Sequence, residues 1–332
     1  MNIAVRRLGP GFVLTATLIA GGCSSLPGRS GSGSGDSTVG SGQAVLSPVQ
    51  AQNLTDGQSA LADGEYDSAL ALFRDVLAEN PTVTAAYVGI GDVHMAREEF
   101  EKAEPAYRRA ARLEPRNFVA QYGHGLSLQM LERFVESIRA YLRALEIDPQ
   151  SGETNLNIAT CYLQIEQPTN AKQYAERAVA LEPDNGAARV NLGAVYEQTG
   201  ENSRAIDEYV TALELLDNTP PVMINLINVL AREKRYQEAV NTALTLIRIE
   251  PSANAYERLG WAYFRLNRYD KSIEAYRNAT DMDPNHWPSY NGIGVNALNT
   301  YLLSNKKDLT AKDEAGRAFR KSLQLNNDQD RV

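Results

Sequence analysis

Residues 188–215 read ARVNLGAVYEQTGENSRAIDEYVTALEL, and their pattern recurs along most of the chain. A tiny residue, Gly193, follows the bulky Leu192, and a small residue, Ala205, and an aromatic one, Tyr209, come 12 and 16 residues after the glycine. The same order returns 34 residues earlier and 34 residues later. A period of this length indicates stacked helical repeats.

Two positions of the period can be followed through the sequence. The tiny slot, at steps of 34 residues with one step of 33, is held by Gly57, Gly91, Gly125, Ala159, Gly193, Ile227, Gly260 and Gly294. The aromatic slot is held by Phe73, Tyr107, Tyr141, Tyr209 and Tyr276, with Ala175 and Ala243 as departures. Most copies end in a proline, which cannot continue a helix. Each copy therefore predicts two amphipathic helices of about 12–14 residues, packed closely where an aromatic ring meets a glycine.

The order of bulky residue, glycine, aromatic, small, aromatic, small and proline resembles the tetratricopeptide repeat family. The resemblance implies an all-α fold, a right-handed α-solenoid of helix-turn-helix repeats whose first helices line a concave groove. It covers about eight copies, at residues 48–81, 82–115, 116–149, 150–183, 184–217, 218–251, 252–284 and 285–327. The last copy contains an insertion of nine residues, and residues 328–332 form a tail.

Three features predict local departures from a regular stack. Ile227 in the tiny slot predicts looser packing in the sixth copy. Pro105, early in a second helix, predicts a late start or a kink. No further helix is expected after Gln324, so Ala318 and Leu323 should be partly exposed, as a frayed end or as a docking edge.

The N-terminus predicts export and anchoring. Residues 1–22 place a basic pair before a short apolar run, as in a signal peptide, and the run is too short to span a membrane comfortably. Cys23 follows a stretch that resembles the lipobox of bacterial lipoproteins, although Ala20 stands where leucine is usual. The resemblance implies lipidation of Cys23 and, through Ser24, favours the outer membrane facing the periplasm over the inner membrane. An ordinary cleaved signal peptide is the alternative. Residues 23–47 would then be the lipidated cysteine and a flexible Ser/Gly-rich linker.

The rest of the sequence gives no sign of catalysis. The formal net charge of −8 argues against generic nucleic-acid binding. His94 and His124 lie in packing slots, His286 lies in a loop, and the lone Cys161 is expected to be a buried small hydrophobe. No metal-ligand spacing, phosphate loop or nucleophile motif is present, so we expect no cofactor, no metal and no enzymatic activity.

One repeated polar slot points to binding. Asparagine stands immediately before the bulky residue in three successive copies, and the next copy has an arginine there. The resemblance places this slot in the concave groove, where an amide can both donate to and accept from an extended peptide. The alternative is that asparagine merely suits the repeat. Two further arginines at the ends of first helices predict a basic patch suited to an acidic or C-terminal segment. The candidate groove residues are Asn157, Asn191, Asn225, Arg258, Arg232 and Arg265.

These observations favour a non-catalytic scaffold that binds protein or peptide segments and is held at the bilayer by its acylated N-terminus. The resemblance implies pilus, secretion or outer-membrane assembly as processes of this kind. Two alternatives remain at this point: a substrate-recognition partner of a separate enzyme such as a glycosyltransferase, and a self-associating spacer. The sequence leaves the oligomeric state open.

Overall fold

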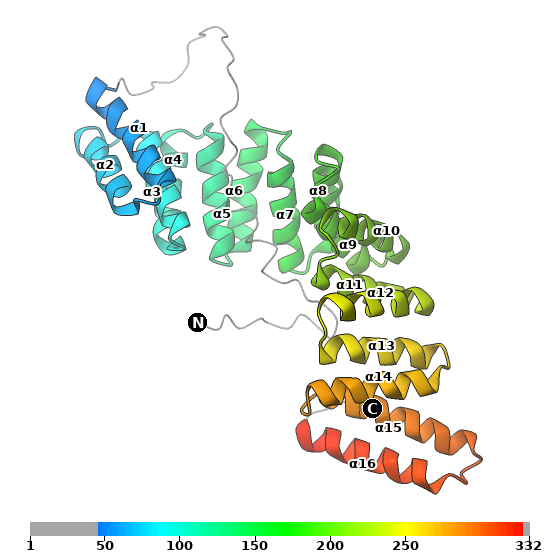
Figure 1. The fold of residues 1–332 in the computed structure, drawn as a ribbon. Coiled ribbons are helices and arrows are strands. Elements are labelled where there is room, and N and C mark those ends of the chain that lie inside the picture. Colours follow the sequence, from blue (N-terminus) through cyan, green and yellow to red (C-terminus); the bar gives the residue numbers. More distant parts are fainter. Residues whose placement is uncertain (1–45, 328–332) are drawn as a thin grey trace. The chain divides into compact units, whose positions relative to one another are not determined.

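The computed structural model describes residues 46–327, so the predicted signal peptide, Cys23, nearly all of the linker and the tail lie outside the described residues. The described part is all-α, with sixteen helices and no strand (Figure 1). No helix in this part is long and apolar enough to cross a bilayer. The helices are α1 (Pro48–Ala62), α2 (Tyr66–Glu79), α3 (Thr84–Ala96), α4 (Phe100–Leu113), α5 (Phe118–Met130), α6 (Phe134–Ile147), α7 (Gly152–Gln164), α8 (Pro168–Leu181), α9 (Gly186–Thr199), α10 (Asn202–Leu215), α11 (Pro220–Arg232), α12 (Tyr236–Ile249), α13 (Ala253–Arg265), α14 (Tyr269–Met282), α15 (Trp287–Leu303) and α16 (Leu309–Leu325).

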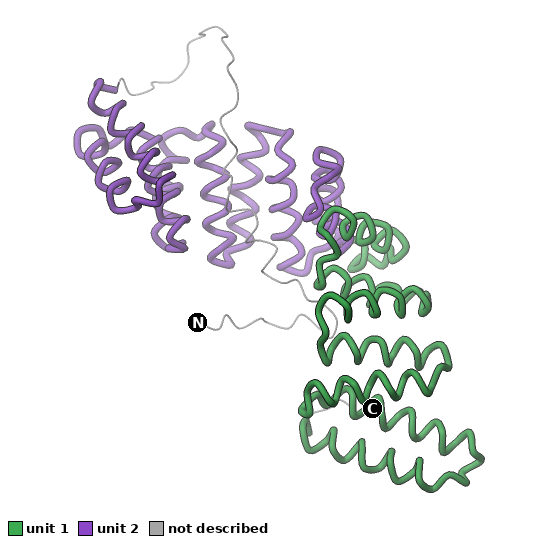
Figure 2. Tube along the Cα trace, in the orientation of Figure 1, with its two compact units in different colours: residues 1–15, 196–332 green, residues 16–195 purple. Residues whose placement is uncertain are grey.

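The described helices fall into two compact units, and the boundary between them in the sequence falls within α9 (Figure 2). The N-terminal unit contains residues up to 195, and the C-terminal unit starts at residue 196. From α1 to α8 and from α11 to α16, each odd-numbered helix packs against the even-numbered helix that follows it, and that helix packs against the first helix of the next pair, as α10 also does against α11. This is the solenoid arrangement expected from the period, in which each repeat contacts mainly its neighbours.

Aromatic rings lie between glycines of two successive repeats. Tyr107 is 2% exposed, and a Cβ atom added to Gly91 of its own repeat would lie 2.8 Å from its ring. A Cβ added to Gly123 of the next repeat would lie only 2.4 Å from the other side. The same arrangement recurs for Phe73 between Gly57 and Gly89, and for Tyr276 between Gly260 and Gly292. The sequence pattern identified the glycine of the tiny slot. It did not identify the second glycine, which lies two residues before the tiny slot and lets one repeat stack closely on the preceding one.

The turn between the helices of a pair uses a left-handed residue at the same register. This position is a glycine at Gly64 (φ 76°) and Gly200 (φ 81°). Other copies place an L residue there, as at Glu98, Glu132 and Glu166 (φ 57° each). Such a residue closes the first helix and reverses the chain. Glycine adopts this conformation without the Cβ penalty that the glutamates incur.

Three expected irregularities have different outcomes. Helix α4 begins at Phe100, at the register of its counterparts, with Pro105 inside it, so the predicted late start is wrong. The backbones of α11 and α12 approach less closely than those of α13 and α14. Even so, Ile227 is 2% exposed, and Ala243, which stands where other copies have a ring, is fully buried. Ala318 is buried rather than partly exposed, whereas Leu323 is 53% exposed.

The insertion lengthens both helices of the last pair. Compared with α13 and α14, α15 gains four residues, α16 gains three, and the loop between them gains two. At about 1.5 Å of rise per residue, the tip of this pair extends about 6 Å further than that of the preceding pair.

Candidate functional site

The asparagine ladder lies mostly within the packing between repeats. Asn191 is 7% exposed, and its amide nitrogen donates to the hydroxyl of Thr160 on the preceding first helix at 2.7 Å. Asn225 is 4% exposed. Asn157 is partly exposed and donates to the Tyr122 hydroxyl at 3.0 Å. The expectation of an open ladder is therefore wrong for Asn191 and Asn225, because their slot faces the preceding repeat, as Gly89 and Gly123 do in other copies.

Arg258 occupies the same slot and lines a groove. Its Nη1 atom donates to Oδ1 of Asn228, on the preceding first helix, at 2.5 Å. Its Nε atom is buried and has no hydrogen-bond partner among the described residues. The groove has a volume of about 590 Å³ and lies along α11, α13 and α15, entirely within the C-terminal unit. We call it the α11–α13–α15 groove; it is lined by Ile227, Asn228, Ala231, Arg232, Asn254, Glu257, Arg258, Trp261, His286 and Pro288.

One arginine of the predicted basic patch, Arg232, is paired with a carboxylate. Arg232 lies 2.8 Å from Oε1 of Glu197, a carboxylate whose side chain is only 1% exposed. The other oxygen of Glu197 accepts from the Tyr209 hydroxyl at 2.9 Å. Burial raises the pKa of Glu197, and Arg232 and Tyr209 oppose this change. Arg232 is therefore committed to an internal ion pair, and its charge is offset before any ligand arrives.

An aromatic wall closes one side of the groove. Trp261 meets Tyr236 edge to face, with ring centroids 5.8 Å apart. The Arg265 guanidinium lies over both rings, 5.1 Å from Tyr236 and 5.8 Å from Trp261, and donates to the Tyr236 hydroxyl at 2.8 Å. Arg265 thus supports the wall rather than lining the groove. The indole of Trp261 presents apolar surface beside the polar groups.

Glu257 and His286 complete the polar lining. Glu257 is partly buried and has no hydrogen-bond or ion-pair partner among the described residues; burial raises its pKa, and the adjacent Arg258 opposes the change. His286 lies in the loop before α15, as predicted, at the N-cap position of that helix; its Nε2 is 2.8 Å from Oδ1 of Asn254 and its Nδ1 is 2.8 Å from Oγ of Ser289. Burial lowers the pKa of His286. The groove therefore combines unused donors and acceptors with balanced charge.

The sequence could have indicated part of this lining. Asn228 and Trp261 occupy the slot that directly follows the tiny residue, at one helical phase in successive copies. Asp92 and Thr160 hold the same slot in earlier repeats. Glu257 and Asn254 have no repeated counterpart of this kind, and only the structure places them in the groove.

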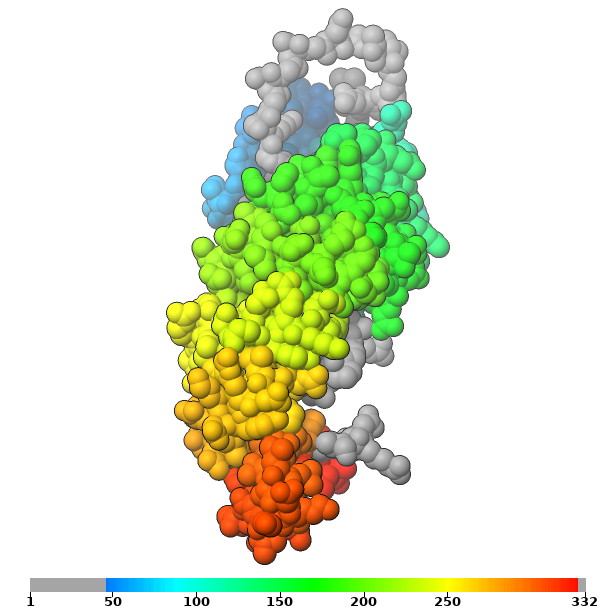
Figure 3. Space-filling view, turned by 90° about the vertical axis from the view of Figure 1, so that its right-hand side faces the viewer, coloured from blue at the N-terminus to red at the C-terminus, as the bar shows by residue number. Residues whose placement is uncertain are grey.

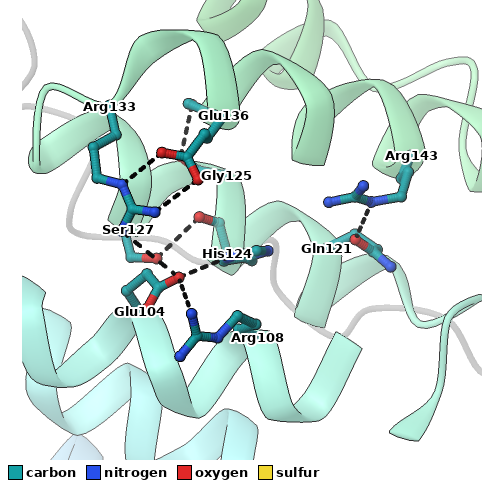
Figure 4. A network of polar contacts seen from close by, with 10 residues as sticks. Glu104, Arg108, Gln121, His124, Gly125, Ser127, Arg133, Glu136 and Arg143 are labelled. Atoms are coloured by element: carbon teal, nitrogen blue, oxygen red, sulfur yellow. Dashed lines mark hydrogen bonds and ion pairs between the residues drawn. The ribbon is translucent and has the colours of Figure 1, made fainter. Parts of the chain in front are cut away.

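The other two histidines make structural contacts in the N-terminal unit, and Figure 4 shows those of His124. Nε2 of His124 lies 3.2 Å from Oε1 of the buried Glu104, which also attracts Arg108 at 3.5 Å and Arg133 at 3.9 Å. Burial lowers the pKa of His124, and Glu104 opposes the change. His94 lies 2.7 Å from Glu99 at the turn that ends α3. These contacts join α4, α5 and the following turn, and they explain the histidines as structural residues.

Cys161 is fully buried, and burial raises the pKa of its thiol to about 12. Its sulfur lies 3.6 Å from the Ser137 hydroxyl. Over residues 46–327 no three His, Cys, Asp or Glu side chains gather in a way that could hold a metal ion.

Comparison with known families matches the chain in three places. Family models described as tetratricopeptide repeat match residues 60–123, 156–221 and 253–286. A stretch of 117 residues is 31% identical to small glutamine-rich tetratricopeptide repeat-containing protein 2 of Mycosarcoma maydis, covering 34% of this chain and 33% of that protein. The chain thus spans about a third of the length of this curated relative.

Solved structures share the fold. The C-terminal part of a TPR repeat-containing protein from Cytophaga hutchinsonii has a TM-score of 0.60 at 16% identity, over 72% of this chain and 98% of that one. PilF of Pseudomonas aeruginosa has a TM-score of 0.54 at 20% identity, over 63% and 95%. A tetratricopeptide repeat protein from Parabacteroides merdae has a TM-score of 0.54 at 12% identity, over 83% and 100%. Identities this low establish the fold alone. The three matched stretches show that the chain contains tetratricopeptide repeats, and the helix pairs form a solenoid like that of these structures.

Proposed function

We propose that the chain is a non-catalytic scaffold that binds an extended segment of a partner protein in the α11–α13–α15 groove. Tetratricopeptide repeats generally act as interaction modules rather than enzymes. The observation that carries the proposal is the combination of the partnerless Glu257 carboxylate, the buried partnerless Nε of Arg258 and the Trp261 wall in one groove.

The dimensions and polarity of the groove suit a peptide backbone. Neighbouring packed helices lie about 10 Å apart, so the three first helices span roughly 20 Å. An extended chain rises about 3.3 Å per residue, so roughly six residues would cross them. Backbone N–H groups can donate to Glu257 or Asn228, while carbonyls can accept from the amide nitrogen of Asn254. Because Glu197 and Glu257 offset Arg232 and Arg258, binding should not require a C-terminal carboxylate.

A block on the groove tests this proposal. Asn254 is exposed and contributes only its hydrogen bond to His286, so Asn254→Trp adds an indole over the groove without removing buried packing. Leu244→Trp adds the same group at an exposed site, 41% accessible, on α12 outside the groove. In pull-downs from envelope extracts, Asn254→Trp should lose the partner that wild type and Leu244→Trp retain. Retention by Asn254→Trp, or loss only by Leu244→Trp, would contradict the groove assignment.

The cellular setting of the scaffold is also a proposal. The signal peptide and the lipobox-like Cys23 support export and acylation, with anchoring in the cell envelope and, through Ser24, at the outer membrane. Several acyl chains on one cysteine would give durable anchoring, whereas one chain gives only marginal binding. The scaffold would then recruit or assemble envelope proteins, for example in pilus, secretion or outer-membrane assembly.

Replacement of the cysteine tests the anchor separately from the groove. Cys23→Ser should abolish incorporation of labelled fatty acid and release the protein from the membrane fraction. Continued acyl labelling of the variant would contradict lipidation at Cys23. Neither result bears on partner binding, which the Asn254→Trp comparison addresses.

A further inference from the structure

The tip of the last helix pair combines three exposed leucines, two of them the most exposed of the described chain, with a cluster of lysines. Leu303 is 67% exposed, Leu309 61% and Leu302 50%. Lys306 and Lys307 lie in the loop between these leucines, and Lys312 lies one turn into α16. We call these six residues the terminal tip; the last pair, orange to red in Figure 3, ends the stack of the C-terminal unit.

The lysines of the tip are not neutralised within the described part of the chain. None of the three lies within ion-pair distance of a carboxylate there, and all three are exposed. Residues 302–313 hold three lysines against two acidic residues, the exposed Asp313 and Asp308, whose carboxylate accepts from the backbone N–H of Ala311 at 2.9 Å, at the N-terminus of α16. That position already favours a negative charge. The tip is therefore locally cationic on a chain whose net charge is −8.

We propose that the terminal tip is a docking surface for an anionic lipid bilayer. The leucines would enter the boundary between headgroups and acyl chains, while the lysines would remain among the phosphates. The tip projects because the insertion lengthens both helices, so it can reach a flat surface before the repeats behind it. The acidic remainder of the chain is repelled by the same surface, which directs the protein to approach tip first. This proposal does not depend on acylation of Cys23.

Vesicle binding by a chain without the acyl anchor tests the proposal. Full-length Cys23→Ser protein should sediment with vesicles of phosphatidylcholine and phosphatidylglycerol, and much less with phosphatidylcholine alone. Rising salt should weaken this association. Exchange of the tip lysines, in a Lys306→Glu, Lys307→Glu, Lys312→Glu variant, should lower the partition coefficient by at least about fivefold per lysine. The matched control, Lys102→Glu, Lys234→Glu, Lys271→Glu, changes the net charge equally at exposed sites elsewhere and should bind within about twofold of the parent.

A fluorescence measurement distinguishes insertion from mere attraction and excludes a contribution from the leader. Leu303→Trp, in the Cys23→Ser chain, should be quenched by phospholipids brominated on their acyl chains, beyond the background of Trp261 and Trp287. Leu244→Trp on α12 should show only that background. Absence of phosphatidylglycerol-dependent binding, equal loss in both lysine variants, or equal quenching at both tryptophan positions would overturn the proposal. Loss of binding to an acidic envelope protein by the tip variant, without any vesicle association, would identify the tip as a protein-binding edge instead.

Discussion

Replacing one buried glycine by alanine should destabilise the stack, although alanine is the better helix former. A Cβ at position 123 would lie 2.4 Å from Cε1 and 2.6 Å from Cδ1 of the Tyr107 ring. Carbon atoms in contact normally lie about 3.5–4.0 Å apart, so the ring would have to move by about 1 Å. It has little room to do so, because Tyr107 is 2% exposed and its hydroxyl donates to Asp92 at 2.5 Å.

The magnitude follows from two opposing effects. Overpacking of a tight core costs about 1–3 kcal/mol, whereas removing a helical glycine contributes about 1 kcal/mol of stability. Gly123→Ala should therefore lower the free energy of unfolding by up to roughly 2 kcal/mol, near the upper end because the Tyr107 ring has little room to move. Gly316→Ala is the matched control, because the nearest atom to a Cβ there, in the Arg320 guanidinium, is 3.6 Å away. That variant should gain about 0.5–1 kcal/mol.

Hydrogen exchange is the suitable assay, since unfolding of a repeat stack need not be all-or-none. Gly123→Ala should lose protection in α4 and α5, and Gly316→Ala should retain or gain it in α16. A second-site change, Tyr107→Leu, should cost less in the Gly123→Ala background than alone, because it relieves the clash. If Gly123→Ala proves neutral or stabilising, close approach of the repeats is not the reason for the glycine.

Three further predictions follow from buried groups. Burial raises the pKa of Asp92 from 3.8 to about 6, so ionisation of this carboxyl should reduce stability as the pH rises between these values. In urea unfolding, the free energy of unfolding of Asp92→Asn should equal that of wild type near pH 4 and exceed it by about 1–3 kcal/mol at pH 7. An identical loss of stability with pH in both proteins would contradict this. Because burial raises the pKa of Cys161 to about 12, this thiol in the Cys23→Ser chain should react with a disulfide reagent only after unfolding. Rapid labelling of the native protein would contradict the burial of the thiol. Leu192→Ala, at a side chain 3% exposed, should cost about 2–5 kcal/mol and raise hydrogen exchange around α9 but not in α2; uniform loss along the chain would argue against modular stability.

The sequence predicted the helix pairs well because their packing depends on residue size at fixed spacing. Gly91 and Tyr107 lie in one repeat, so their relation appears in the period itself. The contact between Tyr107 and Gly123 crosses to the next repeat, and a glycine in the slot before the bulky residue occurs in only some copies. The period therefore identified the first relation and not the second.

The binding site was less predictable from the sequence, because hydrogen-bond and ion-pair partners in the neighbouring repeat decide which side chains remain free to bind a ligand. Register placed Asn191 and Arg258 in one slot, but Asn191 is committed to Thr160 while Arg258 lines a groove. The charge of Arg232 is offset by Glu197 on the preceding first helix, a pairing that no single repeat contains. Replacing the three asparagines together would disturb the stack as well as any ligand, so exposed Asn254 is a cleaner probe.

The most direct test of the account is site-specific photocrosslinking in cells that make the full chain. A photoreactive phenylalanine derivative at position 254 would lie in the α11–α13–α15 groove, and the same residue at position 244 would lie on exposed α12. A discrete adduct is expected at position 254, which mass spectrometry should map to one extended segment of a partner protein, and none is expected at position 244. Adducts at position 244 without any at position 254 would contradict the claim that this groove is the working surface.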